Sequence, residues 1–400
     1  MKKIFEKYKL DEKNPKWKKA CQREKELYSR NNDIRSEFER DYTRIIYSNA
    51  YKRLKHKTQV FFLPQNDHIC TRIEHVTHVE SISYTIANYL GLNLELTKAI
   101  ATAHDIGHSP FGHKGEQILS NILMRDVGET FWHEKNGVNL IDNIELLEDN
   151  LKNKQNLDLT YAVRDGVISH CGEIDENNLK PRDEDIDLNI YQKPGEYAPY
   201  TWEGCVVKVS DKIAYLGRDI EDAIRLKMLD NHLDELYKIL DYDSNEEINN
   251  TTIINNLIFD LCSNSSPEIG LCFSDKAFTM LNKIKEFNYK NIYLSDRLSI
   301  STEYFKLVID TIYYILKKCY DDDGSLNNMN KMKNIYPGVV TNFEEWLSNY
   351  WNLERGEHQK NKVIFDITNE KDFSKAIIIY ISGMTDNFAI DTYNNIINFL

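Results

Sequence analysis

Apolar residues in this 400-residue chain recur at helical spacing in one segment after another, and this pattern constrains the fold most strongly. Between residues 74 and 90 they follow one another at steps of three and four, and Gly91 closes the run. The same spacing recurs over residues 94–105, 203–226 and 302–318. Strand-like alternation is scarce, with residues 362–366 as one short candidate. The sequence therefore predicts an all-α fold with few or no strands.

Short turns, rather than long linkers, separate these helical segments. The sequence shows no internal repeat and no linker rich in Gly, Ser or Pro. We expect a basic N-terminal extension over residues 1–36, a core over residues 37–226, and a helical C-terminal region over residues 227–400 packed on that core. The Asn- and Lys-rich stretch 327–334 has the composition of an exposed loop.

Composition places the chain among cytoplasmic globular proteins. Its hydrophobic fraction of 41% can build a large interior. No apolar run approaches the length of a membrane span, and no apolar segment of a secretory signal follows the N-terminus, so we expect no membrane partner. The seven Cys are scattered and form no CxxC pair, which favours reduced thiols over a disulfide framework.

The charge is unevenly distributed along the chain. The net charge is -13, yet residues 1–60 carry 18 Lys and Arg against 9 Asp and Glu. A basic segment of this kind either meets phosphates or nucleic acid, or is an ordinary solvated surface. The acidic whole argues against a protein that coats nucleic acid without specificity, because such binding depends on neutralising many phosphates.

Histidines gather in one part of the sequence, since nine of the 11 lie within residues 56–170. His75 falls on the apolar stripe of its helix, where it is either a hydrogen-bonded core residue or a metal ligand. His104 and Asp105 end the next helix, where burial of a carboxylate is costly unless it is paired or bound to a cation. A divalent metal that accepts imidazole nitrogen and carboxylate oxygen would offset that cost. The alternative is a helix C-terminus that carries a cationic His.

Two further groups of polar residues follow. Pro110 and Gly112 predict a rigid turn that can direct His108 and His113 toward one cavity. Later, Asp211, Tyr215 and Asp219 are spaced by four and share one helical face. That face either contributes to a site or is a solvated stripe.

At this point the motifs resemble a known family. The chain closely resembles bacterial dGTPase-like deoxynucleoside triphosphate triphosphohydrolases, members of the HD-domain superfamily. The matching stretches, in order, are residues 38–46 with 48–61, residues 71–75 (TRIEH), residues 103–116 (AHDIGHSPFGHKGE) and residues 381–389 (ISGMTDNFA). The resemblance implies an HD-domain helical bundle with an additional helical C-terminal region. Glu74 departs from the family pattern, because many bacterial members have Thr there.

The resemblance also implies a metal site and a catalytic group. The implied metal ligands are His75, His104, Asp105 and Asp211. Manganese or magnesium is the expected metal, with iron and zinc as alternatives. His113 takes the place of the family's catalytic histidine. Glu116 is expected to orient it, with His108 near the α-phosphate and His133 in the same network. The implied substrate contacts are Arg72 and Lys212 to phosphate, and Gln59, Tyr215 and Asp219 to the deoxyribose.

The expected activity is metal-dependent hydrolysis of dGTP, and of other dNTPs, to the deoxynucleoside and inorganic triphosphate. One alternative is an HD-type phosphodiesterase or nuclease that acts on single-stranded nucleic acid, and another is a nucleotide sensor without turnover. The resemblance further implies a homo-oligomer, from dimer to hexamer, and an effector that is a nucleotide or single-stranded nucleic acid. Lys212 and Arg218 stand where many bacterial dGTPases have acidic and tyrosyl residues, which leaves the preferred dNTP open.

Overall fold

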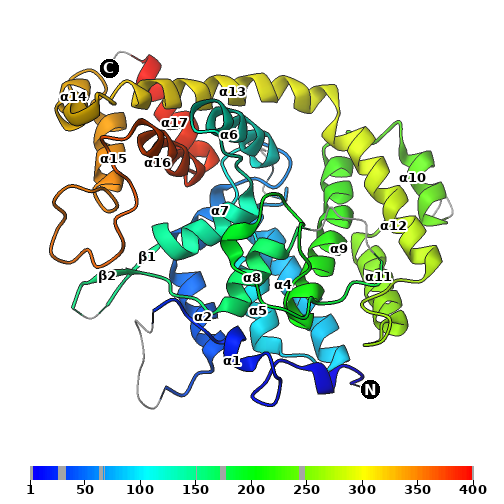
Figure 1. Cartoon of the computed structure of the whole chain (residues 1–400). Coiled ribbons are helices and arrows are strands. Elements are labelled where there is room, and N and C mark those ends of the chain that lie inside the picture. Colours follow the sequence, from blue (N-terminus) through cyan, green and yellow to red (C-terminus); the bar gives the residue numbers. More distant parts are fainter. Residues whose placement is uncertain are drawn as a thin grey trace. The chain divides into compact units, whose positions relative to one another are not determined.

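The chain folds almost entirely into helices. A computed structural model describes residues 3–398 apart from 26–32, 63–65, 67, 150, 172–176 and 243–247 (Figure 1). Those residues form seventeen α-helices and one two-stranded sheet, which confirms the all-α prediction. The chain divides into two compact units. The first comprises Met1–Ile45, Gln59–His104 and Leu159–Ser299, and the second Ile46–Thr58, Asp105–Asp158 and Ile300–Leu400. The boundaries expected at residues 36 and 226 stay a prediction.

The first unit is built around four helices that lie against one another, α4, α5, α8 and α9 (Figure 1). The α-helices of this unit are α1 (Trp17–Ala20), α2 (Glu37–Tyr47, through Ile45), α4 (Arg72–Leu90), α5 (Leu94–Ala103), α8 (Tyr161–Ser169), α9 (Trp202–Arg225), α10 (Leu233–Leu240), α11 (Asn250–Asn264) and α12 (Asp275–Asn288). Short 3₁₀ helices cover Glu6–Tyr8 and Leu188–Ile190, and a π-helical segment covers Tyr289–Tyr293.

Local sequence signals fix the ends of the helices that matter most. The backbone N–H of Thr71, the residue before α4, donates to the Glu74 carboxylate at 2.7 Å, as in a capping box. Glu74 therefore has a structural role at the position where it departs from the family pattern. Gly91 ends α4 with φ +88°, a conformation that glycine adopts without a steric penalty. Asn93 caps α5, and its side chain accepts from two backbone N–H groups.

The basic N-terminal segment is part of the first unit. Phe5, Leu10 and Ala20 are fully or almost fully buried. The Glu203 carboxylate on α9 accepts from the backbone N–H of Leu10 at 3.0 Å and of Asn93 at 2.9 Å, and so ties this segment to the core helices.

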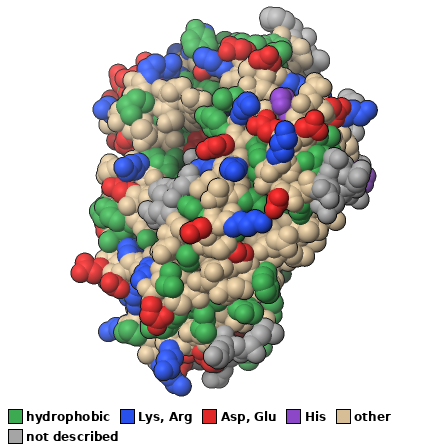
Figure 2. Space-filling view, turned by 90° about the vertical axis from the view of Figure 1, so that its right-hand side faces the viewer, with side chains coloured by type: hydrophobic (Ala, Val, Ile, Leu, Met, Phe, Trp, Pro, Cys, Tyr) green, Lys and Arg blue, Asp and Glu red, His purple; other side chains and the backbone are tan. Residues whose placement is uncertain are grey.

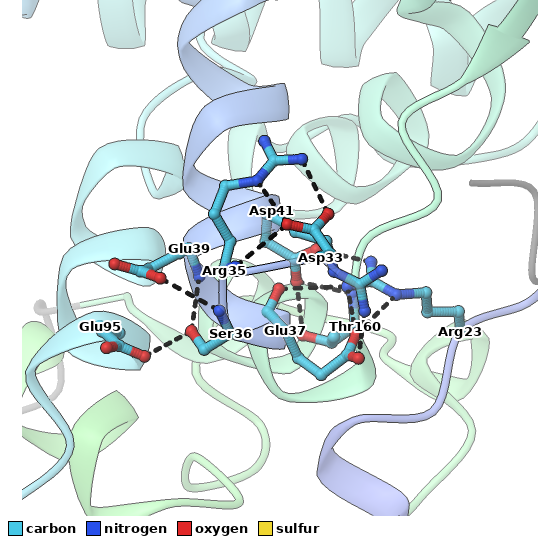
Figure 3. A network of polar contacts seen from close by, with 10 residues as sticks. Arg23, Asp33, Arg35, Ser36, Glu37, Glu39, Asp41, Glu95 and Thr160 are labelled. Carbon is cyan, nitrogen blue, oxygen red and sulfur yellow. Dashed lines mark hydrogen bonds and ion pairs between the residues drawn. The ribbon is translucent and has the colours of Figure 1, made fainter. Parts of the chain in front are cut away.

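A network of ion pairs holds the same segment to α2, as Figure 3 shows. Arg23 donates to Asp41 at 2.6 Å and to Glu37 at 2.8 Å. The buried Asp41 carboxylate also accepts from the backbone N–H of Thr160 at 2.9 Å. Part of the basic charge of residues 1–60 is therefore paired within the protein.

The second unit combines helices with the small sheet. Its α-helices are α3 (Asn49–Arg53), α6 (Gly112–Asp126), α7 (His133–Asn139), α13 (Asp296–Lys317, from Ile300 onward), α14 (Ser325–Lys333), α15 (Pro337–Leu347), α16 (Glu370–Ser382) and α17 (Asp386–Ile397). Short 3₁₀ helices cover Leu54–His56 and Asp322–Gly324, and a π-helical segment covers Leu140–Ile144. Strands β1 (Leu146–Glu148) and β2 (Lys154–Asn156) pair antiparallel, with Leu147 opposite Gln155.

Two local predictions were wrong. Residues 327–334, expected as an exposed loop, lie almost wholly in α14, because Met329 is completely buried and holds this helix to its surroundings. Residues 362–366 form no strand, since only Phe365 makes an isolated bridge, to Trp351.

The surface shows no charge segregation on the face drawn in Figure 2, where basic and acidic side chains are interspersed.

None of the helices in the described ranges combines the length and apolar character needed to cross a bilayer. All seven cysteines, each within those ranges, are free thiols.

Candidate functional site

Three of the four predicted metal ligands meet in the first unit. His75 lies on α4, His104 directly follows α5, and Asp211 lies on α9. Each contributes one ligand atom, and these atoms all lie within 4.8 Å of one another. The nearest Asp211 oxygen is 3.0 Å from Nε2 of His75 and 3.8 Å from Nε2 of His104. The three helices bring these residues together because α4, α5 and α9 pack on one another.

The chemistry of this group suits a divalent cation. Nδ1 of His104 donates to the carbonyl oxygen of Ala101 at 2.7 Å, so its Nε2 lone pair faces Asp211. Burial alone would raise the pKa of Asp211, but the hydrogen bond from His75 and the nearby His104 lower it. A carboxylate that stays charged between two imidazoles supplies the nitrogen and oxygen donors of a divalent-metal site. These residues therefore fit such an ion.

A further histidine, His170, lies next to this group, and the sequence assigned it no role. His170 follows α8, and its Nδ1 donates to the carbonyl oxygen of Val167 at 2.6 Å. Its ring lies edge-on to the His104 ring, with centroids 5.0 Å apart. Two signals in the sequence pointed to it, the density of histidines and the resemblance of residues 170–173 (HCGE) to a further segment of the family. Gly172 and Glu173 of the same sequence segment lie outside the described residues.

The five predicted substrate contacts all belong to the first unit. Arg72 is the buried first residue of α4, and its guanidinium donates to the backbone oxygen of Gln59 at 3.4 Å. Lys212 and Asp219 are buried on α9, and Tyr215 is part-buried on the same helix. Asp219 accepts from the hydroxyl of Tyr293, a partner that sequence spacing could not reveal. The substrate roles of these residues stay predictions.

The four residues of the predicted catalytic group meet in the second unit. The carboxylate oxygen Oε2 of Glu116 is 3.0 Å from Nδ1 of His133 and 3.5 Å from Nδ1 of His113. The same oxygen is 4.0 Å from Nδ1 of His108. The rings of His108 and His133 stack at 3.8 Å, and His113 is exposed at the start of α6. Their catalytic roles stay predictions.

The charges in this group stabilise one another. Burial alone would raise the pKa of Glu116, but His133 and His113 hold it well below its usual range. Burial alone would lower the pKa of His133, yet Glu134, Glu116 and Asp105 raise it to about 10. Glu134, which the sequence reasoning did not single out, is thus part of the electrostatics of this group.

The fourth predicted metal ligand, Asp105, is the residue after His104 and begins the second of the three segments that form the second unit. Its Oδ1 lies 2.8 Å from Nε2 of His108. The peptide bond between His104 and Asp105 therefore joins the two groups along the chain.

Residues 107–112, which we call the histidine turn, are held by segments that are distant in sequence. A Cβ added at Gly107 would lie 2.0 Å from the backbone oxygen of His133, so only glycine allows this close approach. Phe111 has φ +63°, and its backbone N–H donates to the buried Asp386 carboxylate at 2.9 Å. Lys57 donates to the backbone oxygen of His108, a residue of the turn that lies three positions before Phe111. The turn is thus fixed by residues from both ends of the unit's sequence.

Comparisons with known proteins agree with this geometry. The family model described as HD domain matches residues 72–216. A deoxyguanosinetriphosphate triphosphohydrolase-like protein of Caldanaerobacter subterraneus is 32% identical over 91% of this chain and 86% of its own length. A protein with the same description from Clostridium tetani is 31% identical over the same shares, and one from Desulfatibacillum aliphaticivorans is 36% identical over 65% of this chain and 67% of its own. The chain therefore belongs to the deoxyguanosinetriphosphate triphosphohydrolase-like proteins, which are HD-domain, metal-dependent phosphohydrolases.

Proposed function

We propose that the protein hydrolyses deoxynucleoside triphosphates to the deoxynucleoside and inorganic triphosphate, with manganese or magnesium as the cofactor. The observation that carries this proposal is the meeting of His75, His104 and Asp211, from three helical segments, in a chain of this family. Asp105 is proposed as the fourth ligand. When bound, a divalent ion polarises the α-phosphate and lowers the pKa of a coordinated water.

The chain's own residues bind and orient the triphosphate. Arg72 presents a planar guanidinium that can contact two phosphate oxygens at once, whereas Lys212 acts as a point charge. Both side chains are buried and lie on helices that also carry a predicted metal ligand, His75 on α4 and Asp211 on α9.

Release of the deoxynucleoside requires a proton. A water oxygen attacks the α-phosphorus, and the bond from that phosphorus to the 5′-oxygen breaks. The 5′-oxygen is a poor leaving group until it is protonated. His113 is the proposed acid, because an imidazole can donate a proton to a leaving oxygen and this side chain is exposed. Glu116 lies 3.5 Å from Nδ1 of His113 and orients the ring.

Selection of the sugar is proposed for three residues of the first unit. Tyr215 lies one helical turn after Asp211 and would leave no room for a 2′-hydroxyl. Gln59 and Asp219 would hydrogen-bond the 3′-hydroxyl. Asp219 accepts from the Tyr293 hydroxyl, and a carboxylate can accept a second O–H donor as well.

The test is a product analysis. The full-length protein is incubated with four dNTPs and four rNTPs, alone and mixed, with Mn²⁺ or Mg²⁺, and the products are identified by mass. Triphosphate and deoxynucleoside are expected. In a parallel incubation with a single-stranded oligonucleotide, release of nucleoside monophosphate or shortened oligonucleotides would instead support the nuclease alternative. Equal hydrolysis of GTP and dGTP would refute the sugar selection.

The same panel addresses the expected partners. Turnover that begins only in nucleotide mixtures, or on addition of single-stranded DNA, identifies an effector. Light scattering in each condition measures the oligomeric state, which is expected between dimer and hexamer. The cytoplasmic location stays a prediction from composition.

A further inference from the structure

Three histidines of the second unit converge on one carboxylate oxygen. Nδ1 of His133, His113 and His108 lies 3.0, 3.5 and 4.0 Å, respectively, from Oε2 of Glu116. All four residues also offer ligand atoms that lie within 4.8 Å of one another. Hydrogen bonding alone does not require three imidazole nitrogens to approach the same oxygen.

These separations fit a tetrahedral metal site. Zinc binds imidazole nitrogen and carboxylate oxygen at about 2.0–2.1 Å, which places tetrahedral ligands about 3.3 Å from one another. The separations from Glu116 bracket that value, and the ligand atoms lie within 4.8 Å of one another, so an ion can bind once the stacked His108 and His133 rings turn toward it. Three nitrogen donors and one oxygen suit Zn²⁺, whereas Mg²⁺ and Mn²⁺ prefer oxygen ligands.

The surroundings also orient the donors. Nε2 of His108 lies 2.8 Å from Oδ1 of Asp105, so its proton is held there and its Nδ1 faces Glu116. Carboxylates behind ligating histidines commonly fix the ring and the tautomer in this way. The His133 ring stacks on His108 at 3.8 Å, and His113 and Glu116 are three residues apart in the first turns of α6. The donors are therefore partly oriented beforehand, and binding of an ion requires the stacked His108 and His133 rings to turn.

We propose that His108, His113, His133 and Glu116 form a second metal site that takes Zn²⁺, and that zinc bound there inhibits the enzyme. Nδ1 of His113 is then occupied by the ion, and Glu116 no longer orients the ring to give up a proton. The inhibition rests on the proposed function, whereas the binding of zinc does not.

Zinc counting tests the site itself. Metal-free full-length protein is incubated with Zn²⁺, desalted, and assayed for zinc per chain by mass spectrometry. We expect about two ions in the wild type, about one in Asp211→Asn, and clearly less than one when Glu116→Gln is added to Asp211→Asn, because the three remaining imidazoles bind zinc more weakly without the charged ligand. The matched control adds Glu357→Gln instead, because Glu357 is exposed in the same unit, and it should keep the one ion. Equal zinc in the two double variants would overturn the proposal.

A spectroscopic measurement keeps the test valid if a double variant misfolds. Tetrahedral Co²⁺ absorbs visible light far more strongly than six-coordinate Co²⁺. Titration of wild-type protein should give an intense band that is clearly weaker in Glu116→Gln and unchanged in the exposed-histidine control His358→Ala. A band of equal intensity in Glu116→Gln, or no intense band in the wild type, would overturn the site.

Inhibition is measured on the Mn²⁺-loaded enzyme. Filling of the second site should reduce dNTP turnover at least about tenfold, and His358→Ala should be inhibited equally. Full activity with both sites filled would overturn the inhibitory role. A wild type that binds two zinc ions, yet hydrolyses no dNTP when it is free of zinc and loaded with Mn²⁺, would refute the proposed function and leave the zinc site standing.

Discussion

Replacement of Gly107 by alanine tests how tightly the histidine turn is packed. The added Cβ would lie 2.0 Å from the His133 oxygen and 2.3 Å from the Gly137 nitrogen, both backbone atoms of α7. Ordinary contact begins at 3.4 Å, so the two backbones must separate by about 1.4 Å. Side chains cannot relieve this overlap, because backbone atoms cause it.

The expected cost follows from that displacement. Overpacking of a core typically costs about 1–3 kcal/mol. A unit of this size loses about 2–4 °C in Tm for each kcal/mol. The same movement shifts His133 relative to Glu116, and a misplacement of about 1 Å can lower turnover about 10²-fold. We therefore expect Gly107→Ala to lower both Tm and kcat.

Calorimetry and steady-state kinetics on the full-length protein check this expectation. The matched control is Gly338→Ala on α15, where an added Cβ meets nothing within 4 Å. It should leave Tm and kcat unchanged, or raise Tm slightly, because alanine suits a helix better than glycine. If Gly107→Ala matched this control in both measurements, the packing argument for the histidine turn would be refuted.

Four further predictions follow from individual contacts. Asp211→Asn should weaken Mn²⁺ binding at least about tenfold in equilibrium dialysis, since the charged ligand is lost, and unchanged affinity would contradict the metal assignment. His113→Ala should keep its metal content but lose about 10²–10⁴-fold in kcat, and a variant as fast as wild type would exclude His113 as the acid. Asp386→Ala should lower kcat about 10–10²-fold with little change in KM, and should speed hydrogen exchange over residues 106–115, whereas equal exchange rates would show that Asp386 does not hold the turn. Burial alone would raise the pKa of Glu37, but Arg23 and Arg40 lower it, so this carboxylate stabilises the fold above its usual pKa of 4.5 and loses that contribution as the pH falls further. The difference in unfolding free energy between wild type and Glu37→Gln should therefore shrink from pH 6 to pH 3, and a constant difference would contradict the ion pair.

Helix positions were predictable where the apolar spacing was strong. The segments expected over residues 74–90, 94–105, 203–226 and 302–318 correspond to α4, α5, α9 and α13. Helix α14 was missed because Asn and Lys dominate its sequence and interrupt the apolar spacing. Its buried apolar side chain, Met329, does not form a pattern by itself. Strands β1 and β2 were missed because three residues each are too few to show alternation.

Motifs singled out the candidate site residues, but the mutual arrangement of these residues could not be predicted. The resemblance grouped His75, His104 and Asp211, which the structure brings within 4.8 Å. It did not reveal that Tyr293 donates to Asp219 from 74 residues away. Contacts of that kind depend on tertiary packing, and a single sequence carries no local signal for them.

The bond between Phe111 and Asp386 joins residues that are 275 positions apart in the chain. A ribosome must therefore add 275 further residues after Phe111 before the histidine turn receives this partner. Incomplete chains that end before Asp386 would carry the metal-binding motifs without a fixed turn. The turn is therefore expected to reach its final conformation only after α4, α5 and α9 have been synthesised.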